Sequence, residues 1–296
     1  MDTGMLQFLA APFAASLILT GIHAYLGVHV VERGVIFVDL SLAQIAALGA
    51  TIAILMPITN GDPHAPVVYW ISLAFTFVGA LLFSTIRGRR ARIPQEAIIG
   101  ICYAVASAAA ILAMSKATSE SEHLKDMLVG NILAVSWPEV GKTALLYGAI
   151  GAFHFIFRHK FLLISMDPKR AEAEGIPIRF WDFLFYASFG FVVTSSVSIA
   201  GVLLVFCYLI VPSVAAMLYA DTIGRRLAIG WTMGTIVSAL GVYLSLRIDL
   251  PTGATIVCTF GLVLIVMALV RPLIQRHLVP DAHPVNYADR AHRATH

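Results

Sequence analysis

Charged side chains are scarce in this sequence. Of its 296 residues, 20 are Lys or Arg and 17 are Asp or Glu, so that 12% are charged while 59% are hydrophobic. The mean hydropathy is +0.85. In an ordinary soluble domain about a quarter of the residues are charged. The shortage of charge therefore excludes a soluble globular protein and predicts repeated membrane-spanning helices.

Cysteine is also rare, and a complete phosphate-binding loop is absent. The three cysteines lie far apart inside apolar segments, which predicts buried thiols instead of a metal site: Cys102, Cys207 and Cys258. The string VGKT at 140–143 resembles the end of a phosphate-binding loop, but Ser136 stands where its first glycine should be. The chain is therefore predicted not to be an enzyme, and if its function uses ATP, another chain must hydrolyse it. Its dispersed basic residues predict no nucleic-acid partner.

Nine apolar segments have the length of about twenty residues that crossing a bilayer requires. They are residues 5–31, 35–56, 66–86, 94–115, 137–158, 180–199, 201–219, 226–246 and 252–270. The predicted fold is all-α: a polytopic transmembrane domain over residues 1–276 and a disordered cytoplasmic tail over 277–296. The least certain boundary lies at Ser198–Gly201, where the chain must reverse with almost no loop; one long helix there would leave eight spans.

The distribution of basic residues predicts the orientation of these spans. With nine spans and the N-terminus outside, four of the 20 basic residues fall on the outer side: Lys116, Lys125, Lys142 and Arg247. Cytoplasmic loops retain Lys and Arg, so an outside N-terminus and an inside C-terminus are favoured. The first segment lacks the basic start and cleavage site of a signal peptide and is counted as a span.

A short charged insert, ISMDPKRAEAEGIPIRFWDF at 164–183, interrupts the apolar chain. Asp167 and Pro168 form a good N-cap and first-turn pair, and Gly175 suits a C-cap. The insert therefore predicts a helix at about 166–176, on the cytoplasmic side of the membrane.

Several stretches resemble the permease subunits of bacterial zinc/manganese ABC uptake transporters. MDPKRAEAEGI resembles the coupling-helix segment of that family, and the other resembling stretches are AGVLLVFCYLIVPSVAAML (200–218), MLVGNILAVSWPEV (127–140) and IDLPTGATIV (248–257). The resemblance implies a type II importer fold in the bacterial inner membrane, working as a homodimer with a cytoplasmic ABC ATPase and an extracytoplasmic metal-binding protein. It also implies no cofactor bound by this chain, ATP acting through the partner, and a divalent metal ion as cargo.

By the same resemblance, the helix that contacts the ATPase includes five residues of the insert: Asp167, Pro168, Ala171, Glu174 and Gly175. The alternative is a plain connecting loop with a surface helix.

The resemblance also indicates where the metal passes. The second span of the family carries an Asp and a His; here Asp39 matches the Asp by its six-residue distance from Arg33, but the His is missing and Ala43 or Gln44 stands in its place. A carboxylate with an amide suits a harder ion such as manganese better than zinc. Two alternatives stay open: Asp39 caps its helix or pairs with Arg33, and Gln44 makes an interhelical hydrogen bond.

Three further groups of residues are candidates. His23 lies deep in the first span, where an ionisable group is expensive and often functional. Pro212 is expected to loosen the seventh span and to free the carbonyls of Tyr208 and Leu209. It is also expected to help gate the translocation path. The alternative is a kink that serves packing alone. Glu120, Glu122 and His123 in an outer loop are candidates for docking the binding protein, against the alternative of a solvated loop.

Other functions remain open at this stage. A permease for a metal complex such as a siderophore or cobalamin shares the architecture. An ion-coupled secondary transporter is less favoured because it would need several mid-membrane carboxylates, whereas Asp39 and Asp182 lie near span ends.

Overall fold

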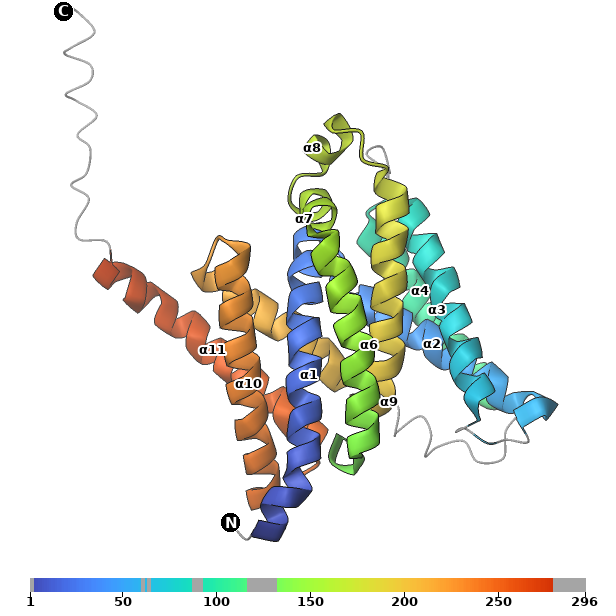
Figure 1. Cartoon of the computed structure of the whole chain (residues 1–296), viewed down its shortest axis with the longest axis horizontal. Coiled ribbons are helices and arrows are strands. Elements are labelled where there is room, and N and C mark those ends of the chain that lie inside the picture. Colours follow the sequence, from blue (N-terminus) through green and yellow to red (C-terminus); the bar gives the residue numbers. More distant parts are fainter. Residues whose placement is uncertain (1–2, 60–61, 63–64, 87–92, 116–131, 279–296) are drawn as a thin grey trace, which may run out of the picture.

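The structure is a computed structural model of the chain and describes residues 3–59, 62, 65–86, 93–115 and 132–278. Every regular element in these ranges is a helix (Figure 1). The long helices are α1 (Thr3–Arg33), α2 (Val38–Leu55), α3 (Pro66–Ile86), α4 (Gln95–Met114), α6 (Trp137–Ile156), α9 (Ile178–Tyr219), α10 (Ile223–Ile248) and α11 (Thr252–Leu278). The short ones are α7 (Arg158–Met166), α8 (Pro168–Ala173), η1 (Pro57–Thr59) and η2 (Ile132–Ala134). The predicted tail from 279 onward lies outside the described residues.

The chain is a multi-pass membrane protein. Among the described residues, seven helices are long and apolar enough to cross a membrane, or eight when α6 and α7, which meet at a 74° bend, count as one broken span. Lipid cannot satisfy backbone polar groups, so each helix keeps its hydrogen bonds within itself. The boundaries follow the predicted segments closely; α3 matches the expected 66–86.

Helix α9 is the central element. It packs against α1 and α3 and also against α2, α10 and α11, while α2, α3 and α4 form a group on one side and α10 and α11 lie on the other (Figure 1). Four of the largest fully buried side chains come from α9: Phe185, Tyr186, Phe189 and Tyr208.

The direction of α9 changes at Gly201. Gly201 has φ 76° and ψ 159°, a backbone conformation open almost only to glycine, and it is the non-helical residue inside α9. Before this point Ser196 lies 3.3 Å from His23 of α1. Thirteen residues later Leu209 packs on Gly27, four residues further toward the C-terminal end of α1. The first half of α9 therefore runs antiparallel to α1, and after the bend at Gly201 the chain returns to α1 at Gly27.

The second half of α9 approaches α1 closely at Gly27. A Cβ atom at Gly27 would lie 1.9 Å from the Leu209 carbonyl oxygen and 2.3 Å from Ser213 Oγ. Gly21, six residues earlier on α1, has open space at the same position. Small residues let membrane helices pack backbone to backbone, so Gly27 sets the distance between α1 and α9.

We expect Gly27→Ala to destabilise the protein by about 2 kcal/mol or more, because backbone atoms, unlike a flexible side chain, cannot yield to the added methyl group. Gly21→Ala is the matched control on the same helix and should leave stability nearly unchanged. The measurement is the thermal unfolding midpoint of the detergent-solubilised protein. Equal midpoints for the two variants would contradict the close α1–α9 contact.

Candidate functional site

A buried ion pair joins the end of α1 to the start of α9. Arg33 Nη1 lies 2.7 Å from Asp182 Oδ1, and the two side chains are 1% and 0% exposed. The Arg33 guanidinium also lies 3.9 Å from the centre of the Phe185 ring. Burying two charges is costly unless they are paired and further hydrogen-bonded, so the groups around this pair are part of the site.

Ser165, near the end of α7, is the next member of this network. Arg33 Nε donates to Ser165 Oγ at 2.9 Å, and His29 Nδ1 lies 2.8 Å from the same oxygen. Ser165 donates its own proton to the Phe161 carbonyl at 2.9 Å. The hydroxyl is therefore an acceptor toward both neighbours, and His29 carries its ring proton on Nδ1.

The same region holds a second buried histidine. His154 of α6 stacks on the Phe161 ring at 4.3 Å, and its Nε2 lies 2.8 Å from Ser188 Oγ. Ser188 donates to the Phe185 carbonyl, so His154 donates from Nε2 and accepts the Tyr25 hydroxyl proton on Nδ1 at 3.3 Å. His29 and His154 are each 1% exposed. They are thus internal links between α1, α6, α7 and α9.

Asp39 lies in the first turn of α2 and is 1% exposed. Neither of its carboxylate oxygens has a hydrogen-bond partner in the described part of the chain. The expected alternative of pairing with Arg33 is wrong, because Arg33 pairs with Asp182 across the α1–α9 contact. Position in the first helical turn favours a negative charge, but a buried carboxylate without partners is expensive. Asp39 is therefore suited to receive a cation.

The start of α2 has a second acid nearby that sequence reasoning missed. Glu96 of α4 accepts a hydrogen bond from the Phe37 backbone amide at 2.9 Å through Oε1. Its other oxygen, Oε2, is buried and lacks a hydrogen-bond partner among the residues described. The position of Glu96 in the first turn of a span gave only a weak signal in the sequence.

The other two predicted metal-path residues form no metal-binding group with Asp39 in the described part of the chain. Gln44 is half-buried, on a different face of α2. His23 is fully buried in α1, with Nδ1 donating to the Leu19 carbonyl at 2.8 Å and Nε2 near Ser196 Oγ. Within the described ranges, no three His, Cys, Asp or Glu side chains form a group that could hold a metal ion.

The charged insert folds as α8. The Asp167 side chain accepts from the Arg170 backbone amide at 3.0 Å and caps the helix, and Pro168 is its first residue. At the other end, Gly175 has φ 73°. The Gly175 amide donates to the Glu172 carbonyl and the Ile176 amide donates to the Ala171 carbonyl, each at 3.0 Å. At six residues α8 is shorter than the expected 166–176, because these caps end it on both sides.

One face of α8 is anchored and the rest is exposed. Ala171 is fully buried, whereas Asp167, Pro168, Glu174 and Gly175 are exposed. Arg170 Nε lies 2.9 Å from Glu174 Oε1 on the outer surface. The helix therefore presents a charged, capped surface at one end of the molecule (Figure 1).

Pro212 is buried inside α9 and does not break it. The single non-helical residue of α9 is Gly201, so the expected loosening at Pro212 is wrong. The carbonyl of Leu209 accepts a hydrogen bond from Ser213 Oγ at 2.9 Å and is therefore not free. Pro212 instead packs toward Gly230 of α10. The Ser213 hydroxyl does not replace the amide donor that proline lacks, because that amide would donate to the Tyr208 carbonyl and not to Leu209.

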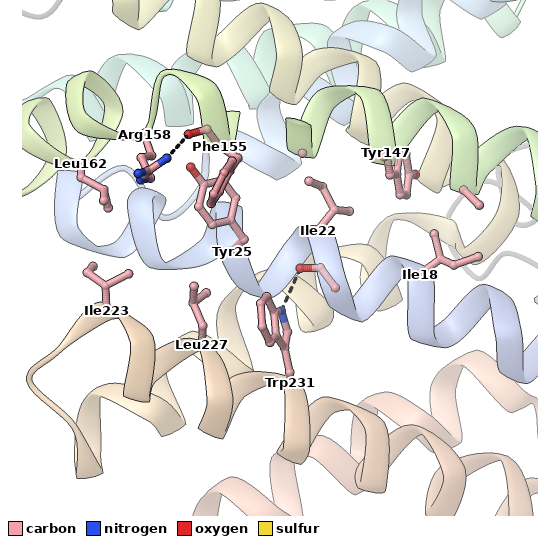
Figure 2. A pocket seen from close by; sticks show the side chains of 14 residues that line it. Ile18, Ile22, Tyr25, Tyr147, Phe155, Arg158, Leu162, Ile223, Leu227 and Trp231 are labelled. Atoms are coloured by element: carbon pink, nitrogen blue, oxygen red, sulfur yellow. Dashed lines mark hydrogen bonds between the residues drawn. The ribbon is translucent and has the colours of Figure 1, made fainter. Parts of the chain in front are cut away.

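Figure 2 shows a groove between α1, α6, α7 and α10, with a volume of about 600 Å³. Its walls are apolar, with Ile18, Ile22, Leu227 and Trp231 among the lining residues, and Arg158 stands at one end. Among the residues that the structure describes, no carboxylate, imidazole or thiol lines it. Hard divalent cations need oxygen ligands, so this groove is not the metal site. The candidate docking residues Glu120, Glu122 and His123 lie outside the described residues.

Comparisons with known proteins agree with these features. Residues 5–271 match the model of a family described as the ABC 3 transport family. The chain is 25% identical over 271 residues to the manganese transport system membrane protein MntC of Listeria innocua, covering 91% of this chain and 93% of that protein. It is 24% identical over 233 residues to the chelated iron transport system membrane protein YfeD of Yersinia pestis, covering 76% and 78%.

A solved structure shares the fold. PsaBC from Streptococcus pneumoniae, determined in complex with Fab, superposes with a TM-score of 0.73 at 23% sequence identity over 88% of this chain and 90% of that chain. The all-α, multi-pass membrane fold predicted from the sequence is thereby confirmed.

Proposed function

The chain belongs to the ABC 3 transport family, and on that premise we propose that it is the membrane-spanning permease subunit of an ATP-dependent uptake transporter for a divalent metal ion. The observation that carries the proposal is the family match over residues 5–271 of a chain built from membrane-spanning helices. The relatives named above transport manganese or chelated iron. A bacterial cytoplasmic membrane location, a homodimer, a separate ABC ATPase and an external metal-binding protein belong to the same proposal.

The proposed topology has nine spans, with the N-terminus outside and the C-terminus inside. Helix α9 has 42 residues. At 1.5 Å per residue its two halves together measure about 63 Å, roughly twice the hydrocarbon thickness of a bilayer. Together with the reversal at Gly201 this length supports two spans within α9. The basic-residue asymmetry supports the orientation and puts α8 in the cytoplasm.

Asp39 is proposed as the main metal-facing residue, with Gln44 and His23 as secondary candidates. The Asp39 carboxylate is buried, and neither of its oxygens accepts a hydrogen bond from the described residues. Carboxylate and amide oxygens favour a hard ion, and zinc prefers imidazole and thiolate ligands. A manganese-like ion is therefore the proposed cargo.

We expect Asp39→Asn to lower manganese uptake by about tenfold or more, because hard divalent cations bind mainly through carboxylates. Uptake of radioactive manganese, zinc and iron by cells at equal protein level is the measurement. Asp221→Asn, at an exposed carboxylate in the α9–α10 connection, is the matched control and should behave as wild type. If the wild-type protein supports uptake of none of these metals, the proposed function is wrong; if Asp39→Asn transports normally, only the role of Asp39 is.

Helix α8 is proposed to dock on the ATPase. The exposed residues Asp167, Pro168, Glu174 and Gly175 form the docking surface, and buried Ala171 holds the helix to the membrane domain. The closed caps at both ends make α8 a rigid unit that can follow the movement of a partner.

Reversing one charge on this surface tests the docking role. We expect Glu174→Arg to lower co-purification of the ATPase subunit by about fivefold or more, because a like charge now faces the part of the partner that accepted the carboxylate. Arg247→Glu, an exposed charge reversal at the other end of the molecule, should leave co-purification unchanged. ATPase binding that survives Glu174→Arg and a Gly175→Ala variant would remove the docking role.

Pro212 retains its proposed part in gating, now through packing between α9 and α10 instead of free carbonyls. We expect Pro212→Ala to leave folding and ATPase binding intact and to slow metal uptake about threefold, since a restored amide can donate to the Tyr208 carbonyl and stiffen the helix. Initial uptake rates at equal protein level measure this. An unchanged rate would assign Pro212 to packing alone. Docking of the binding protein at Glu120, Glu122 and His123 also remains a proposal.

A further inference from the structure

The buried network around Arg33 connects α8 with the start of α2. We propose that Arg33 is a positioning residue that transmits displacement of α8 to Asp39, and so couples ATP hydrolysis to metal release. This inference rests on the proposed function, in which α8 docks on the ATPase and Asp39 faces the metal.

The first link runs from α8 to α1. Ser165 lies two residues before Asp167, the N-cap of α8, in the last turn of α7. Its hydroxyl accepts from Arg33 Nε at 2.9 Å while its own proton is committed to the Phe161 carbonyl. Arg33 is thus hydrogen-bonded to α7, the helix that leads into α8. Because only a short junction separates α7 from α8, a displacement of α8 also displaces Ser165.

The second link holds α9 to the same guanidinium. Arg33 Nη1 bonds Asp182 Oδ1 at 2.7 Å, and the Phe185 ring lies against the guanidinium plane at 3.9 Å. The planar fork of Arg can serve two acceptors in fixed directions, which a single ammonium cannot do. One side chain therefore holds α1, α7 and α9 together at one point.

The third link runs from α1 to α2. Arg33 is the last residue of α1, and Gly34 follows with φ 67°. The Gly34 and Val35 amides close back on the Val31 and Val30 carbonyls at 3.1 and 3.2 Å, which fixes the turn. Asp39 comes six residues after Arg33, in the first turn of α2. A shift of the end of α1 must therefore move the start of α2, and with it the Asp39 carboxylate.

A merely structural ion pair would stabilise the fold without affecting how many ions each ATP carries. The distinguishing quantity is therefore the ratio of metal transported to ATP hydrolysed. This ratio is measured in liposomes that contain the complete transporter with its ATPase and binding protein, with manganese as the transported ion.

Ser165→Ala is the principal variant, because it removes the hydroxyl that joins α7 to Arg33 and leaves the Arg33–Asp182 pair in place. We expect assembly and ATP hydrolysis to persist while the transport-to-hydrolysis ratio falls about three- to tenfold, the range expected for one lost hydrogen bond. Arg33→Lys, which keeps the charge and loses the fork, should lower the ratio at least as much. Ser238→Ala is the matched control: Ser238 is equally buried and bonds Tyr208 and Gly234, away from the network.

A normal ratio in Ser165→Ala overturns the proposal, whatever Arg33→Lys does. So does a Ser165→Ala protein that no longer assembles with the ATPase, because the bond would then be structural. Failure of the proposed function would give different results. Either the wild-type protein would support no metal uptake, or substitutions in α8 would leave ATPase binding unchanged.

Discussion

The Arg33–Asp182 ion pair is the interaction on which the arrangement of this protein depends. Two charges buried together must be paired and hydrogen-bonded, or they destabilise the fold. Satisfying them fixes the end of α1 against the start of α9, and the additional bond to Ser165 brings α7 to the same point. The position of α8 then follows, because α7 leads directly into it.

Glycine sets the complementary contacts deeper in the molecule. Gly201 lets α9 reverse, and Gly27 lets the returning half lie directly on α1. In lipid, no hydrophobic force drives helices together, so close backbone packing supplies much of the free energy of helix association. The polar network at one end and the glycine contacts further in therefore hold the same pair of helices at two levels.

The functional features differ in how far the sequence could reveal them. Asp39 could be singled out because a carboxylate is conspicuous in an apolar span, and Asp167, Pro168 and Gly175 because caps are local signals. The partner of Arg33 could not: Asp182 is 149 residues away, and Asp39 offered a nearer carboxylate. The same holds for Pro212, whose packing beside Gly230 of α10 no local pattern specifies.

By itself the sequence determined the all-helical, membrane-spanning character of the chain, the limits of most helices and the capped helix α8. These follow from local rules, since lipid requires every span to be apolar and to satisfy its own backbone. Only the tertiary structure decided which buried polar groups meet. It paired Arg33 with Asp182, committed His29 and His154 to serine hydroxyls, and left the Asp39 oxygens without partners among the residues described. Such pairings depend on how helices distant in the chain pack side by side, which no local pattern specifies.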